Sequence, residues 1–197
     1  MGLTPVPDDR LATVVTTLEM RERPRPRPLP TSRMRLVRWR VPEPTKYRAL
    51  FRRVGAPWLW YSRLLLDDAA LLTRLARAEV YAVTDPAGIE VGMLELESAG
   101  AAVALSYFGL VPELTGQGHG RWLMGHALAI AWRPGTICVH VNTCTLDHPS
   151  ALGFYRAQGF VAVRRTVETF PDPRVAGLLP ADAAPHIPLL ASRRAPA

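Results

Sequence analysis

The chain has 197 residues, which is enough for one well-buried domain and too few for two domains of ordinary size. Hydrophobic residues make up 48% of the sequence, but no apolar run approaches the ~18 residues of a membrane-spanning helix. The N-terminus lacks the apolar core of a secretion signal because Pro5, Pro7 and Asp8 interrupt it. We therefore expect a cytoplasmic protein with no membrane partner.

The net charge of +7 at pH 7 arises largely from one stretch near the N-terminus. Residues 21–33 read RERPRPRPLPTSR, so that arginine and proline alternate. Proline prevents helix formation and favours an extended, solvated chain. This composition predicts a linker that crosses the domain surface. Docking on an acidic partner and attraction of an anionic cofactor are the alternatives.

The first half of the chain predicts two strands and two helices. The β-branched run over residues 11–20 indicates a strand before the linker, and alternating polarity indicates another over residues 34–41. Helices are expected over residues 44–53 and 67–77, where apolar side chains recur at helical spacing or an aspartate supplies a cap.

The second half continues with five strands and two helices. Strands are expected at residues 79–84, 91–97, 101–110, 136–143 and 160–170, and helices at 120–132 and 149–158. The alternation predicts a single α/β (α+β) domain with a mixed central sheet and helices on both faces. We divide the chain into an N-terminal strand segment (1–20), a linker (21–33), the main domain (34–170) and a Pro/Ala-rich tail (171–197). The tail holds one short strand candidate, residues 186–190.

Residues 114–121, LTGQGHGR, carry the strongest functional signal. The three glycines, at 116, 118 and 120, let the backbone approach a ligand closely because no Cβ stands in the way. A helix that begins there points unpaired amides and the positive end of its dipole at that ligand. The pattern predicts a phosphate-binding loop. A Walker loop is excluded because it needs Gly-Lys-Ser/Thr, and Lys46 is the only lysine.

This loop and a second motif together resemble the GCN5-related N-acetyltransferase (GNAT) family. The family's pyrophosphate loop, Arg/Gln-x-x-Gly-x-Gly/Ala, corresponds to residues 115–120, with Thr115 in place of Arg or Gln. Its second motif corresponds to His148, Ala151, Tyr155, Gly159 and Phe160, with His148 in place of Asn. The resemblance is specific over residues 100–162 and looser over residues 33–99.

The resemblance implies that two neighbouring parallel strands, 101–110 and 136–143, splay apart to hold the pantetheine of acetyl-CoA. It implies cofactor contacts from the first of these strands, the loop and the second motif: Phe108, Leu110, Val111, Gly116, Gln117, Gly118, His119, Gly120, Arg121 and His148. No metal is expected.

Acetyl transfer requires an acid for the departing thiolate and a base that keeps the amine neutral. Tyr155 is the expected acid, because the pKa of a phenol, ~10, lies near that of a thiol; a purely structural, buried tyrosine is the alternative. Glu95 is the expected base, on the strand beside the splayed one, and Glu97 two residues later is its alternative. Cys144 as an acyl-carrying nucleophile is a further alternative.

The acceptor pocket is expected where aromatic residues gather between the first two helices. Trp58, Trp60 and Tyr61 would stack on an apolar or cationic amine, or would simply anchor this connection to the core. Asn142 and Asp147 are the polar groups expected there. The resemblance does not identify the acceptor beyond a small-molecule or peptide amine.

The sequence thus predicts an N-acetyltransferase that moves an acetyl group from acetyl-CoA to an amine by direct attack in a ternary complex. One alternative is an acyl-CoA-binding regulatory module without turnover, and another is a nucleic-acid binder that uses residues 21–30. One strand fewer than the family usually has follows the helix that holds Tyr155. We therefore expect residues 12–20 to cover a sheet edge, within the chain or across a homodimer.

Overall fold

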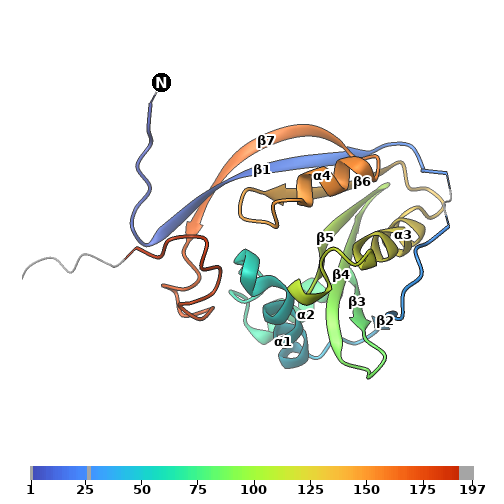
Figure 1. Ribbon diagram of the computed structural model, residues 1–197, viewed down its shortest axis with the longest axis horizontal. Coiled ribbons are helices and arrows are strands. Elements are labelled where there is room, and N and C mark those ends of the chain that lie inside the picture. Colours follow the sequence, from blue (N-terminus) through green and yellow to red (C-terminus); the bar gives the residue numbers. More distant parts are fainter. Residues whose placement is uncertain (1, 26–27, 191–197) are drawn as a thin grey trace, which may run out of the picture.

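The computed structural model describes residues 2–25 and 28–190, and its seven strands form one mixed sheet in the order β2-β3-β4-β5-β6-β1-β7 (Figure 1). The strands are β1 (Arg10–Met20), β2 (Arg35–Trp39), β3 (Ala78–Thr84), β4 (Glu90–Ala99), β5 (Ala102–Leu110), β6 (Cys138–Cys144) and β7 (Val161–Pro171). The helices are α1 (Pro44–Gly55), α2 (Asp68–Leu75), α3 (His119–Ala131) and α4 (Ala151–Ala157). Each of these elements lies in a segment that the sequence predicted, with shifts of a few residues at the ends.

Acidic caps fix where the first two helices begin. The Glu43 carboxylate accepts hydrogen bonds from the amides of Thr45 and Lys46, at 2.8 and 2.7 Å, and Pro44 opens α1. In α2 the Asp67 carboxylate accepts from the Ala70 amide at 2.8 Å. Both helices thereby satisfy amides that have no partner within the helix.

The N-terminal strand lies inside the sheet. β1 pairs antiparallel with β6 over Val15–Met20 and with β7 along most of its length, from Arg10 to Glu19. The prediction that this segment is a strand is confirmed, and it covers an edge of β6 within the chain, which is one of the two arrangements expected. Its other side pairs with β7, so that β1 is not itself an edge strand. The edges of the described sheet are β2 and β7. β1 is interior because it pairs on both sides, and its Leu18, at 0% exposure, belongs to the core.

The sheet opens between β5 and β6. These two strands run parallel and pair only from Ala102 with Cys138 to Leu105 with Val141. A β-bulge follows at once, since Glu95 of β4 faces Tyr107 while Leu96 faces Leu105. Beyond it β5 stays with β4 and β6 stays with β1, so the strands diverge. This is the splay that the family resemblance implied.

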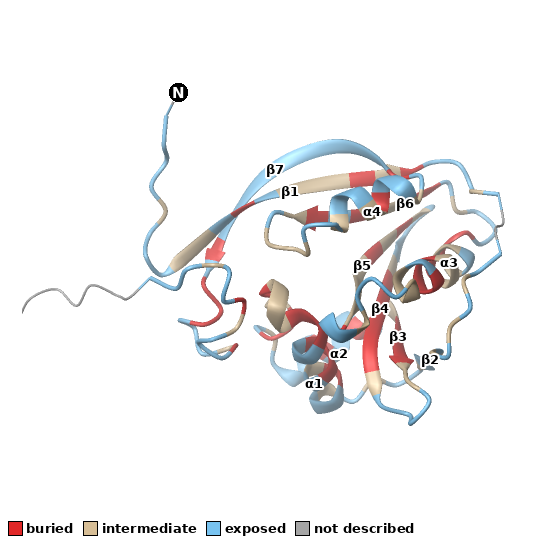
Figure 2. Cartoon of the chain, viewed as in Figure 1, coloured by how far each residue is buried: buried red, intermediate tan, exposed pale blue. Residues whose placement is uncertain are grey.

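The helices cover both faces of the sheet. Tyr107 of β5 meets Phe51 of α1, with ring centroids 4.7 Å apart, whereas Phe108 meets Phe154 of α4 at 5.8 Å. Successive strand residues point to opposite faces, so α1 and α4 lie on opposite sides. Figure 2 shows the burial concentrated along the middle strands, while β7 is exposed along almost all of its length.

The segment after β7 is organised by a buried ion pair. Arg174 bonds Asp172 at 2.7 Å, and their side chains are 1% and 3% exposed. The same guanidinium donates to the carbonyl of Ile187 at 2.8 Å, while Leu179 is buried in the core. Residues 186–190 form no strand, so the predicted strand there is wrong. Pro188 in that stretch has no amide to donate to a ladder.

The interior position of β1 predicts a severe effect of its removal. Deleting residues 1–20 should abolish folding, because it removes the core residues of β1, exposes those they packed against, and leaves both β6 and β7 with an unpaired edge. Soluble yield and thermal unfolding followed by circular dichroism measure this. Deleting residues 2–6, which precede β1 and its flanking hydrogen bonds, is the control and should leave the melting temperature unchanged. A soluble 1–20 deletion with wild-type melting would contradict the role of β1.

Candidate active site

A pocket of about 610 Å³ opens where β5 and β6 diverge. Its walls come from the end of β5, the end of β6, the loop before α3, α4, and the aromatic connection that follows α1. Most predicted site residues line it: Trp58, Trp60, Phe108, Leu110, Gly116, Gly118, Gly120, Arg121, Asn142, Asp147, His148 and Tyr155. The splay therefore brings residues far apart in the sequence around one cavity.

The glycine-rich loop has the backbone that the sequence predicted. Gly116 and Gly118 have φ values of 79° and 84°, a region that side-chain-bearing residues rarely adopt. Gly118 is also the N-cap of α3, which has no side-chain cap. A Cβ on Gly118 would lie 3.9 Å from the Arg121 guanidinium, so this cation lies over the loop.

The loop presents a row of free amides. In the described part of the chain, the backbone N–H groups of residues 116–120 donate to no protein acceptor. The Arg121 amide differs from the expectation, because it already donates to the carbonyl of Gly118 at 3.1 Å. Five amides at the positive end of a helix form an anion-binding site of the kind that accepts a pyrophosphate.

Three predicted cofactor residues lie behind the pocket wall. Val111 is 6% exposed, and its amide donates to the carbonyl of Val91 at 2.9 Å. The Gln117 side chain turns back to the Glu113 carbonyl at 2.7 Å. The His119 ring bonds the Ser32 hydroxyl at 3.0 Å, on the outer side of the loop. Only the backbone of the last two residues is available to a ligand.

Tyr155 and His148 stand on the α4 side of the pocket. Tyr155 is 7% exposed and contacts Phe108, Phe154 and Phe160 edge-on, with centroid distances of 6.1, 5.6 and 6.0 Å. Burial, and then the negative charge of Asp147, raises the pKa of its hydroxyl. His148 Nδ1 accepts from the Ser150 amide at 3.1 Å, so this ring organises the start of α4.

Asp147 places a carboxylate in the pocket without a cationic partner. Its Oδ2 accepts from the Thr143 hydroxyl at 2.7 Å and from the Cys144 amide at 2.8 Å. No ion pair within residues 2–25 and 28–190 includes Asp147. Desolvation raises the pKa of this carboxyl, and the hydrogen bonds partly oppose the shift. A carboxylate in this situation is typical of functional sites.

The aromatic connection forms the far wall. Trp60 packs against Tyr107 with centroids 4.9 Å apart, and Trp58 meets the His148 ring at 5.2 Å. Tyr61 lies outside the pocket, where it stacks on Phe170 at 4.4 Å. Its hydroxyl donates to Glu168 at 3.0 Å, and burial followed by this bond raises its pKa to about 12.

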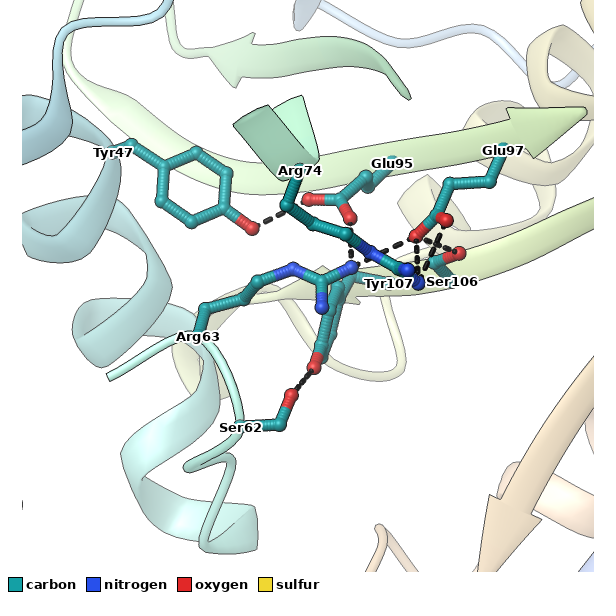
Figure 3. A network of polar contacts seen from close by, with 8 residues as sticks. All are labelled: Tyr47, Ser62, Arg63, Arg74, Glu95, Glu97, Ser106 and Tyr107. Atoms are coloured by element: carbon teal, nitrogen blue, oxygen red, sulfur yellow. Dashed lines mark hydrogen bonds and ion pairs between the residues drawn. The ribbon is translucent and has the colours of Figure 1, made fainter. Parts of the chain in front are cut away.

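Glu95 does not reach the pocket. Its side chain is 0% exposed and is held by the Arg63 guanidinium and the Tyr47 hydroxyl, each at 2.5 Å (Figure 3). Burial raises the pKa of this carboxyl, against the opposing effect of Arg63. Both carboxylate oxygens are thus engaged on the α1 side of the sheet, and nothing in the pocket contacts them. Glu95 therefore has a structural role, and the expectation that it is the base is not supported by its position.

Glu97 extends the same cluster toward the surface. It bonds Arg63 at 2.8 Å and Arg74 at 2.7 Å, and accepts from the Ser106 hydroxyl at 2.9 Å (Figure 3). Ser106 lines the pocket, and its neighbour Tyr107 bonds Ser62. The cluster therefore fixes the bulge of β5 from behind.

The sequence analysis placed no site residue on the first or the last strand, although both contribute to the pocket. Val15 of β1 and Glu168 of β7 line the pocket because β1 lies next to β6 and β7 lies next to β1. The β-branched run around Val15 indicated a strand but carried no signal for its place in the sheet. Cys144 also lines the pocket, and burial together with Asp147 raises the pKa of its thiol, which disfavours a nucleophilic thiolate.

Comparison with known proteins decides the family. Residues 76–162, which include β3 to α4, match the family model described as acetyltransferase (GNAT) domain. This part of the chain is a GNAT domain. It contains both motifs noted in the sequence and the splay between β5 and β6. No curated protein matches the sequence significantly.

Solved structures share the fold of this GNAT domain at low sequence identity. A GCN5-related N-acetyltransferase from Sphaerobacter thermophilus has a TM-score of 0.55 and 14% identity, over 81% of this chain and 51% of that one. The ribosomal-protein-S18-alanine N-acetyltransferase from Escherichia coli has a TM-score of 0.54 and 11% identity, over 71% of this chain and 94% of that one.

The chain spans less than two thirds of the first solved structures it matches. It covers 63% of a Staphylococcus epidermidis protein, which has a TM-score of 0.51 and 15% identity over 83% of this chain. Across the described residues, the helices are too short or too polar to cross a membrane.

Proposed function

We propose that this protein is an N-acetyltransferase that takes its acetyl group from acetyl-CoA and passes it to an amine by direct attack. The observation that carries the proposal is the pocket at the splay, which combines free loop amides, a tyrosine hydroxyl and an unpaired carboxylate. A cytoplasmic location fits the two cysteines, Cys138 and Cys144, which are free thiols.

The pocket residues fit the chemical parts of acetyl-CoA. The amides of residues 116–120 and the Arg121 guanidinium suit a pyrophosphate. The walls at Phe108 and Leu110 suit the less polar pantetheine arm, and the unpaired side of β5 offers backbone groups to its amides. When bound, the acetyl thioester supplies an activated carbonyl: the amine nitrogen bonds to its carbon, the C–S bond breaks and sulfur leaves as a thiolate.

Tyr155 holds the proton that the thiolate needs. Its raised pKa keeps the phenol protonated throughout the neutral range, so the O–H group is always available as a donor. The protonated form is lost only when the pH rises through this raised pKa. The aromatic contacts around the ring fix its orientation.

Asp147 replaces Glu95 as our candidate for receiving the ammonium proton. The carboxylate form is the base, and its raised pKa means that this form is lost at a higher pH than for an ordinary aspartate. Trp58 and Trp60 stand beside it, and Glu168 adds a second carboxylate to the pocket. Aromatic faces and carboxylates together favour a cationic amine as the acceptor.

Coenzyme A should raise the melting temperature of the protein, because a ligand that binds only the folded state stabilises it. At about 100-fold excess over the dissociation constant the gain is about 2.7 kcal/mol, or roughly 5–10 °C for a chain of this size. Gly118→Asp should abolish the shift, since it puts a carboxylate in phosphate space.

Gly135→Asp is the matched control for this measurement. Gly135 also has a positive φ, 88°, but does not line the pocket. Its substitution should lower the melting temperature without changing the CoA-induced shift. The absence of a shift in the wild-type protein at millimolar CoA would refute the cofactor assignment.

Tyr155→Phe should lower kcat by roughly 10²-fold or more, the usual scale for loss of a general acid, and leave CoA affinity unchanged. Phenylalanine retains the ring and its aromatic contacts. Acetyl transfer from acetyl-CoA to a panel of amines provides the measurement, with Tyr81→Phe, on the distant β3, as control. Turnover that survives in Tyr155→Phe would assign this residue a structural role.

Asp147→Asn should lower activity and raise stability at the same time. The folded state holds this carboxyl with a raised pKa, so ionised Asp147 lowers stability at neutral pH, and a neutral asparagine relieves that cost. Each kcal/mol recovered corresponds to roughly 2–4 °C in melting temperature. The acidic limb of the pH–rate profile should disappear with the carboxylate.

Glu95→Gln provides the contrasting variant. Unlike Asp147, Glu95 balances a buried cation, so its loss leaves Arg63 with only Glu97 as a partner and should lower the melting temperature, yet keep the acidic limb of the pH–rate profile. If the acidic limb of the pH–rate profile disappears in Glu95→Gln and persists in Asp147→Asn, Glu95 is the base.

A further inference from the structure

The arginine-proline segment has to cross the domain because of where β1 lies. Four strands separate β1 from β2 in the sheet order, a distance of about 24 Å at the usual strand spacing. The described residues that lead into β2, 28–34, run along the outer side of α3 (Figure 1). We call residues 28–34 the brace.

The brace packs against α3 at a glycine. An ideal Cβ built on Gly125 would lie 2.0 Å from Cδ2 of Leu29, a distance that real atoms do not reach. Gly125 therefore leaves a notch in the helix, and Leu29 fills it. This contact holds the brace against the middle of α3.

The brace also bonds the phosphate loop directly. The Ser32 hydroxyl lies 3.0 Å from Nδ1 of His119, which is the first residue of α3. The same hydroxyl accepts from the Met34 amide at 3.1 Å, which fixes its position within the brace. His119 follows Gly118, so the bond acts where the loop becomes a helix.

Apart from the Gln117 side chain, which bonds the Glu113 carbonyl on the other side of the loop, the described residues give the start of α3 little side-chain support. Gly118 caps α3 without a side chain, and the first turn is closed by two bonds to the Gly118 carbonyl, from Arg121 at 3.1 Å and Trp122 at 3.3 Å. Glycine loses more conformational freedom on ordering than any other residue. A hydrogen bond from the brace that already orders this turn reduces the entropic cost of ordering the loop when a phosphate ligand binds.

We propose that Ser32 is a positioning residue for the cofactor site, which acts through His119 to hold the phosphate loop in its ligand-binding shape. The inference rests on the proposed function in that its ligand is the pyrophosphate of CoA. In this proposal the arginine-proline segment connects β1 to the brace and so allows the brace to reach the loop.

The test compares ligands with and without a pyrophosphate, using the full chain. Ser32→Ala should weaken CoA binding by roughly 2- to 10-fold, the scale of one hydrogen bond, and leave binding of pantetheine unchanged. Ser32→Thr keeps the hydroxyl and should restore CoA affinity. Thr31→Ala removes an exposed hydroxyl one residue away and should have no effect. Isothermal titration calorimetry measures all four proteins.

A second measurement needs no ligand. Hydrogen exchange of the Arg121 and Trp122 amides should be faster in Ser32→Ala than in the wild type, because the first turn of α3 loses its outer support. Leu29→Ala should have the same effect by releasing the brace from Gly125, which guards against a Ser32 variant that fails to fold.

The outcomes separate the two hypotheses. Unchanged CoA affinity and unchanged hydrogen exchange in Ser32→Ala would refute the positioning role of Ser32. An equal loss of affinity for CoA and for pantetheine would refute it as well. A wild-type protein that binds no CoA would overturn the proposed function, while the exchange experiment would still decide whether the brace orders the loop.

Discussion

The pairing of β1 with both β6 and β7 is the constraint on which the rest of the structure depends. Because β1 satisfies one edge of β6, that strand remains in the sheet although it leaves β5 after Leu105. The splay can therefore stay open without an isolated strand. The same position of β1 brings β7, and with it Glu168, to the side of the pocket.

Two groups of carboxylates show how ion pairing distinguishes structure from chemistry in this domain. Glu95 and Glu97 are paired with arginines and support the bulge of β5. Asp147 has neutral hydrogen-bond donors, and its charge is left for a ligand to balance. A buried ion pair that loses one partner is destabilised strongly, whereas removing an uncompensated charge relieves the fold. The two sites thus respond oppositely to loss of charge.

The sequence predicted local features well and long-range placement poorly. Polarity patterns located every strand and helix, and the glycines of residues 116–120 located the anion site, because each depends on neighbours in the chain. The position of β1 inside the sheet, and the pairing of Glu95 with Arg63, depend on contacts between distant segments. The order in the segment after β7 was missed because one buried pair, Asp172 with Arg174, replaces regular backbone pairing.

The place of β1 also bears on how the chain reaches its fold during synthesis. Arg10 bonds the Thr169 carbonyl across a sequence separation of 159 residues, so β1 leaves the ribosome long before its partner strand exists. Contacts of such separation slow folding, and a waiting strand rich in valine and threonine is prone to wrong pairing. The charged, proline-rich stretch that follows it is a poor template for a second strand, since charge and proline both disfavour strand pairing. The composition of this stretch therefore bears on folding as well as on the finished domain.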